Sequence, residues 1–130
     1  MTANGFRRTS RVIDTVREHA GRSNIPFERG MLLHFQLGKD EDAALNRALE
    51  LNFGFPQELQ WAGNTEQLKR FALLGSADTV HQRIEEYLAA GCGTFCFAPM
   101  EKGNAAYQEQ IQMFAVDVLP KLRAPDPIST

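Results

Sequence analysis

Residues 73–100, LLGSADTVHQRIEEYLAAGCGTFCFAPM, decide the fold, because they predict a capped helix, a glycine stop and a strand. Ser76 stands directly before the helical pattern, where its hydroxyl can accept a hydrogen bond from a free N–H of the first turn. The apolar residues recur at helical spacing and predict one buried face, made of Val80, Ile84, Tyr87 and Leu88. Gly91 then occupies the position where a left-handed residue commonly ends a helix.

The segment after this glycine, residues 94–98 with the sequence TFCFA, is apolar or nearly so at every position. Such a run is typical of a strand that is covered on both faces, as in the parallel sheets of α/β proteins. Pro99 is expected to end the strand. The stretch therefore predicts an α/β fold.

The N-terminal half predicts a second strand between two helices. Residues 1–8 show no pattern and are expected to be disordered, after which Ser10 is expected to cap a helix that ends at Gly21. The apolar stripe of that helix is expected to comprise Val12, Ile13, Val16 and Ala20. Residues 31–37, MLLHFQL, predict a strand. Asp40 opens another helix with a face of small and apolar residues, namely Ala44, Leu45, Ala48 and Leu49.

The other segments predict a connection, a last helix and a tail. Residues 53–71 mix glycine, proline and large aromatic residues, which is typical of a surface connection, with a short helix near its end. A final helix from Asn104 is expected to bury a stripe formed by Tyr107, Ile111, Phe114, Ala115, Val118 and Leu119. Residues 124–130 read as a disordered tail. The chain is thus expected to hold two parallel-type strands and about four helices in a single domain over residues 1–130.

Composition limits the classes of function. The 130 residues suit one domain, and 43% hydrophobic residues are ordinary for a globular protein. A net charge of -2 offers no basic face for nucleic acid, and no run approaches the roughly 20 apolar residues that span a bilayer. We therefore expect a cytoplasmic protein. If the strand forms, Cys92 and Cys96, four residues apart, are separated by roughly 13 Å, too far for a disulfide. We expect buried small residues here, and the alternative is a reactive or metal-binding role.

Candidate site residues follow from the parallel sheet, because sites in such folds form where the strands end. His34 and Gln36 share one face near the end of the first strand, and Met100 and Lys102 directly follow the second. These four residues are the predicted cofactor-binding set. The competing explanation for His34 is a core or interface histidine, and that for Lys102 is a solvated lysine in a turn. Ser76 is explained by its cap rather than by anion binding. Phosphate-loop, dinucleotide-binding and nucleophile motifs are absent from the sequence, and no catalytic residue is assigned.

Several segments in order resemble the C-terminal part of luciferase-like flavin-dependent monooxygenases. They are GSADTV at 75–80, RIEEYLAAG at 83–91 and VLPKLR at 118–123. The resemblance implies a partial (β/α)8 TIM barrel, with the two predicted strands as its seventh and eighth. It also implies FMN or a deazaflavin as cofactor, and an oxidoreductase that is incomplete without a missing N-terminal barrel portion or a homo-oligomeric partner. The alternative is a non-catalytic α/β module that self-associates through exposed sheet edges.

Overall fold

The computed structural model describes residues 2–51 and 65–123. The helices and strands run in the order α1 (Ala3–His19), β1 (Gly30–Leu37), α2 (Glu41–Leu51), α3 (Thr65–Phe71), β2 (Ala72–Gly75), α4 (Ala77–Ala89), β3 (Thr94–Pro99) and α5 (Asn104–Asp117), and a short 3-10 helix, η3 (Leu119–Lys121), follows. Of the predicted connection at 53–71, residues 53–64 lie outside the described residues, as does the tail at 124–130, and the short helix expected near the end of that connection is α3. Among the described helices, none is long and apolar enough to cross a bilayer.

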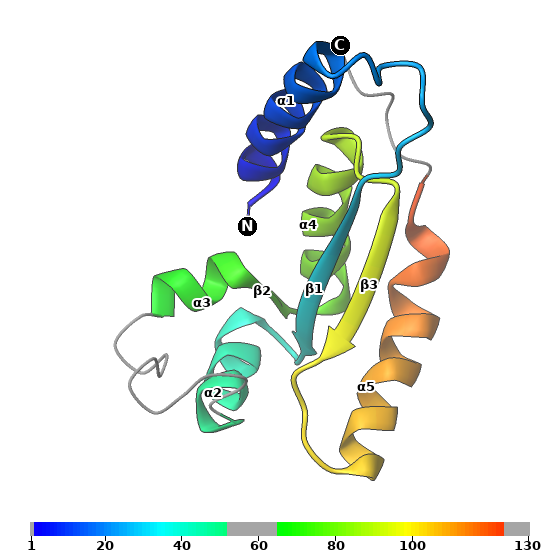
Figure 1. Ribbon diagram of the computed structural model, residues 1–130. Helices are drawn as coiled ribbons and strands as arrows, with labels where there is room; N and C mark the ends of the chain where they lie inside the picture. The colour runs from blue at the N-terminus through cyan, green and yellow to red at the C-terminus, as the bar shows by residue number, and fades with distance from the viewer. Residues whose placement is uncertain (1, 52–64, 124–130) are drawn as a thin grey trace.

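The three strands form one parallel sheet in the order β2-β1-β3 (Figure 1). His34 of β1 is in register with Ala72 of β2 on one side and with Ala98 of β3 on the other. The predicted α/β class and parallel strands are confirmed, and the arrangement is consistent with part of a TIM barrel. The two predicted strands are neighbours in space, but β2, which lies between them along the chain, was not predicted.

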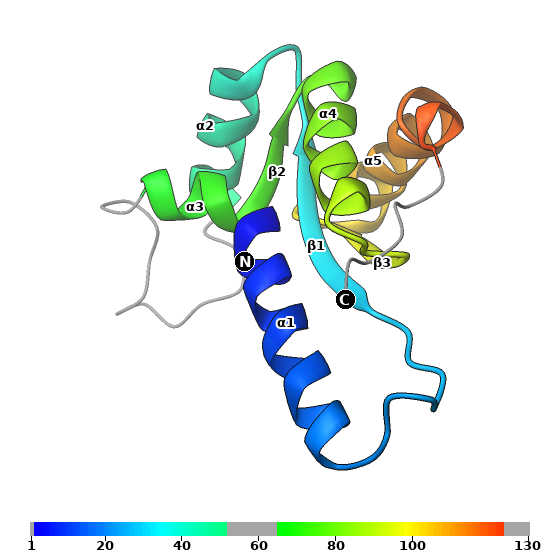
Figure 2. The ribbon, with the colours of Figure 1, turned by 90° about the horizontal axis from the view of Figure 1, so that it is seen from above.

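Helices cover the sheet from two sides, with α2 and α3 on one side and α4 and α5 on the other (Figure 2). Alternate residues of β1 point to the α4 and α5 side because side chains in a strand alternate between its faces. The larger core cluster contains Phe6, Leu33, Phe35, Leu37, Leu73, Val80, Ile84, Tyr87, Leu88, Ala90, Cys92, Phe114 and Val118. The smaller cluster, on the α2 and α3 side, contains Ala44, Ala48, Leu51, Leu68, Ala72, Leu74 and Met100.

Helix α4 has the local features that the sequence predicts. The Ser76 hydroxyl accepts a hydrogen bond from the Thr79 N–H at 3.3 Å, and Gly91 adopts φ of 92° after the helix. The predicted stripe is buried, and it comprises Val80, Ile84, Tyr87 and Leu88. Asp40 likewise accepts a hydrogen bond from the Ala43 N–H at 2.8 Å, at the start of α2. These predictions hold because caps and helical spacing depend on residues close together in the sequence.

The start of α1 differs from the prediction. The helix begins at Ala3, and the hydroxyl of Thr2, not of Ser10, accepts the capping hydrogen bond from the Gly5 N–H at 3.1 Å. The expectation that residues 1–8 are disordered is therefore wrong for residues 3–8. Phe6 and Ser10, one turn apart, are buried, whereas Val12 and Val16 are exposed. The side of α1 that contacts the rest of the protein is thus rotated away from the predicted stripe.

Helix α5 and strand β3 are less covered than expected. The buried row comprises Gln110 and Phe114 of α5 and Val118 directly after its end, spaced by four residues. Tyr107, Ile111 and Leu119 of the predicted stripe are exposed. On β3, Thr94 and Cys96 are exposed, so this strand is covered on one face and not on both. The predicted burial of Cys96 is wrong for the same reason, although Cys92 is buried as expected.

Candidate functional site

The carboxyl ends of the three strands meet at one edge of the sheet, where α/β folds place their sites. Hydrogen bonds continue beyond the strands and hold this edge together. The Gly38 N–H donates to the Gly75 carbonyl at 3.0 Å, and the Met100 N–H donates to the Phe35 carbonyl at 2.9 Å. Side chains that follow the strands are thereby held close to one another.

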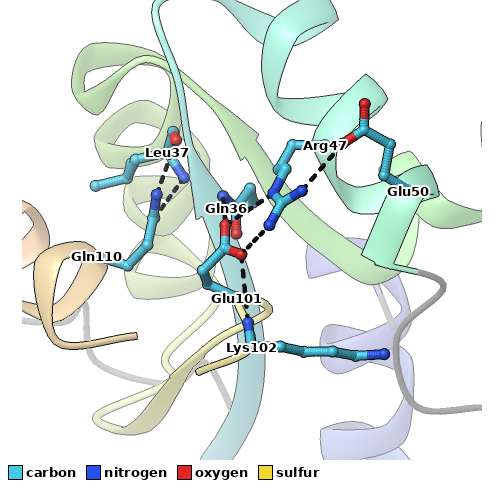
Figure 3. A network of polar contacts seen from close by, with 7 residues as sticks. All are labelled: Gln36, Leu37, Arg47, Glu50, Glu101, Lys102 and Gln110. Atoms are coloured by element: carbon cyan, nitrogen blue, oxygen red, sulfur yellow. Dashed lines mark hydrogen bonds and ion pairs between the residues drawn. The ribbon is translucent and has the colours of Figure 1, made fainter. Parts of the chain in front are cut away.

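Glu101 is the centre of a polar network at this edge (Figure 3). Its carboxylate accepts hydrogen bonds from Gln36 Nε2 at 3.1 Å and from Arg47 Nε at 3.0 Å. Arg47 Nη2 donates to the other carboxylate oxygen, and Arg47 Nη1 donates to Glu50 at 3.0 Å. The Lys102 backbone N–H adds a longer contact to Glu101 at 3.4 Å. One carboxylate therefore ties together β1, α2 and the loop after β3.

The electrostatics of the network keep Glu101 ionised. The Glu101 side chain is 7% exposed and the Arg47 side chain 45% exposed, so the arginine joins a buried carboxylate to the solvent. The Arg47 hydrogen bond lowers the pKa of Glu101, and burial opposes this effect less strongly. The same hydrogen bond raises the pKa of Arg47. Near neutral pH the pair is charged, and its charges compensate each other.

The ionised Glu101 sets the orientation of the Gln36 amide. A carboxylate can only accept hydrogen bonds, so the NH2 group of Gln36 must face it and the amide oxygen is turned elsewhere. That oxygen, Oε1, is buried and has no hydrogen-bond partner in the described part of the chain, and Gln36 as a whole is 3% exposed. A buried acceptor without a donor costs about 1–3 kcal/mol. Gln36 Oε1 is thus an oriented acceptor whose hydrogen-bonding capacity is unused among the described residues.

The four residues predicted to bind a cofactor have different surroundings. Gln36 is in the Glu101 network, and Lys102 contacts the network by its backbone while its exposed side chain extends away from Glu101 (Figure 3). His34 is half-buried, stacks on Phe71 with ring centroids 5.3 Å apart, and has its pKa lowered by burial. Met100 is fully buried in the smaller core cluster. Lys102 is thus exposed at the edge and Gln36 is buried within the network. His34 lies earlier on the same strand face as Gln36, and Met100 packs in the core.

Three residues of the network, Glu101, Arg47 and the exposed Glu50, were not among the predicted site residues. Glu101 had a signal in the sequence, because it follows β3 at the edge where sites form. Arg47 also had one: it shares a helical face with Ala44, Ala48 and Leu51, so it lies on the side of α2 that packs on the sheet. The pairing itself joins residues 54 positions apart, which no local pattern indicates.

Replacing Arg47 with methionine is expected to move acid unfolding to higher pH. The pKa of Glu101 is lowered in the folded protein, so its stabilising contribution is present above the ordinary value of 4.5 and is lost as the pH falls through the folded value. Without Arg47, the main cause of this lowering is gone and burial raises the pKa. Circular dichroism against pH measures the midpoint. Glu50→Gln, which removes only the exposed partner of Arg47, is expected to leave the midpoint unchanged, and an equal shift in both variants would contradict the explanation.

Comparisons with known proteins show the fold. No model of a known protein family matches the chain, and no curated protein matches it. Among solved structures, the chain is similar to the coenzyme F420 dependent tetrahydromethanopterin reductase from Methanopyrus kandleri, with a TM-score of 0.63 and 20% sequence identity. The match covers 94% of this chain and 43% of that protein. The chain therefore spans less than half the length of this structural neighbour, with an α/β parallel fold in common.

Proposed function

We propose that this chain forms the C-terminal part of a luciferase-like flavin- or deazaflavin-dependent oxidoreductase, and that it contributes one side of the cofactor site. The observation that carries the proposal is the buried Gln36 oxygen, which the Glu101 and Arg47 network orients at the carboxyl edge of a parallel sheet. The structural neighbour, whose name states dependence on coenzyme F420, supports a deazaflavin or a related flavin as the cofactor class.

The residues at this edge fit part of such a cofactor. Gln36 Oε1 would accept a hydrogen bond from a ring N–H, and the exposed Lys102 side chain would meet a phosphate. The half-buried His34 precedes Gln36 on the same face of β1, and its flat ring would lie against the cofactor. When bound, the flavin or deazaflavin would supply hydride transfer or oxygen activation. Ligand sites usually enclose most of a ligand, and this edge offers one wall, so we propose that the chain alone is catalytically incomplete.

Titration of the isolated chain with FMN is expected to show weak binding at this edge. In two-dimensional 15N NMR spectra, the largest shift changes should come from the amides of Gln36, Leu37, Glu101 and Lys102, with an affinity in the high micromolar range or weaker. Gln36→Leu should reduce the changes, whereas Gln82→Leu, at an exposed position on α4, should not. Submicromolar affinity would contradict incompleteness, and an absence of shift changes at this edge would contradict the proposed site.

A second candidate function is a non-catalytic α/β module that self-associates, and the strand order favours it. In a complete barrel successive strands are neighbours, whereas here β1 lies between β2 and β3, an order also found in open doubly wound sheets. Within the described ranges, the outer edges of β2 and β3 pair with no other strand. Leu32 is 58% exposed on the face of the sheet where Cys96 is also exposed. Open edges and an apolar face promote association with another chain.

Light scattering at micromolar concentration is expected to give a mass at least twice the 14.6 kDa of one chain. Leu32→Lys should reduce the mass toward the monomer, because a charge on the uncovered face opposes burial of that face. Val116→Lys, at an exposed position on α5, is the matched control and should keep the parent mass. A monomeric parent that unfolds cooperatively would contradict self-association. It would not affect the cofactor proposal, which the FMN titration tests.

A further inference from the structure

A cavity of about 290 Å³ lies between α1 and the segment that enters β1. In Figure 1, α1 lies beside the start of β1, at the end of the sheet opposite the carboxyl ends of the strands. Its walls are mainly apolar, with side chains of Phe6 and Ile13 from α1 and of Phe27 and Met31 from the segment that enters β1. Arg29 lines the same cavity. The space therefore combines an apolar body with a single cationic side chain.

Arg29 is held in place but incompletely hydrogen-bonded. Its Nη2 donates to Asp14 of α1, and its guanidinium lies over the Phe27 ring, 5.4 Å from the centroid. The Nε–H is buried and has no acceptor among the residues that the structure describes. A buried N–H of a charged group has a strong requirement for an oxygen acceptor.

Two guanidinium groups share one carboxylate beside the cavity. Arg17 pairs with the same Asp14 oxygen at 3.8 Å and lies over Phe27 at 4.8 Å, so one carboxylate serves two guanidinium groups. Glu28 lines the cavity as well, but it is exposed and forms no ion pair with either arginine. One further carboxylate close to Arg29 would complete the hydrogen bonding of this guanidinium group.

We propose that this cavity binds a monocarboxylate with an apolar tail of medium length, such as a medium-chain fatty acid. The carboxylate meets Arg29, and the tail lies against Phe6, Ile13 and Met31. The volume corresponds to about ten water molecules of liquid, which suits a chain of the size of octanoate. This site is separate from the proposed cofactor edge and does not depend on it.

The test is a pair of NMR titrations of the full chain with octanoate and with octylammonium, which have the same tail length and opposite head charges. Octanoate should shift the amides of Phe6, Ile13, Arg29 and Met31. Octylammonium should bind at least about tenfold more weakly, because its head cannot accept the Arg29 N–H. Arg29→Met should weaken octanoate binding by about tenfold or more. Arg11→Met, at an exposed position on α1 outside the cavity, should leave it unchanged.

Ile13→Trp is a second variant, which fills the cavity and keeps Arg29. It should abolish octanoate binding, so the proposal stays testable if Arg29→Met lowers the folded fraction. Circular dichroism establishes that each variant is folded. Equal binding of the two head groups would overturn the proposal, because it would indicate a general apolar surface. Octanoate that leaves the cavity amides of the folded parent unchanged would overturn it as well.

Discussion

Replacing Ile84 with alanine is expected to lower the free energy of unfolding by about 2–5 kcal/mol. Ile84 has 0% exposure and lies in the middle of the buried face of α4, in the cluster that joins this helix to β1 and α5. The substitution removes buried carbon atoms and leaves a cavity that close-packed neighbours fill only in part. Because α4 connects β2 to β3, the loss affects the whole sheet.

Ile111→Ala is the matched control, since Ile111 is also inside a helix but is 44% exposed. Its loss of stability should be well under half of that for Ile84→Ala, because less apolar surface leaves water when it folds. Urea unfolding followed by circular dichroism, at one fixed protein concentration, measures both variants. Equal losses for the two would show that α4 is not part of the main core.

Replacing Gln110 with methionine is expected to cost about 2–4 kcal/mol, because it removes both hydrogen bonds that the side chain makes to the end of β1. Gln110 Oε1 accepts from the Leu37 N–H at 2.8 Å, and its Nε2 donates to the Leu37 carbonyl at 3.0 Å (Figure 3). The Gln110 side-chain amide thus makes the same pair of hydrogen bonds to Leu37 that the backbone of an adjacent strand would make. Both Gln110 and Leu37 are buried, so water cannot easily replace these bonds.

Gln112→Met controls for helix propensity and for side-chain size, because Gln112 is exposed on the same helix. Its effect should stay within about 0.5 kcal/mol. Hydrogen exchange gives a more specific measurement, since the Leu37 amide should lose protection in Gln110→Met and keep it in the control. Unchanged protection at Leu37 would contradict the role assigned to Gln110.

The sequence alone determined the elements whose signals are local. Ser76, the apolar spacing of α4 and Gly91 act within one helix, so their pattern predicted the helix and its two ends. The strand at 31–37 and the helix after Asp40 were predictable for the same reason. Of the candidate site, Gln36 was predictable, because a polar residue near the end of an otherwise apolar strand stands out.

Tertiary structure alone decided the features that depend on distant partners. β2 is four residues long, entirely buried and directly joined to α3, so only its pairing with β1 identifies it as a strand. The hydrogen bonds between strands are made by the backbone, which is the same for every sequence, and the order β2-β1-β3 is therefore not encoded in any local pattern. The Arg47 to Glu101 pair, like the two hydrogen bonds between Gln110 and Leu37, exists because packing brings these groups together. Packing also leaves the Gln36 oxygen without a donor among the residues that the structure describes.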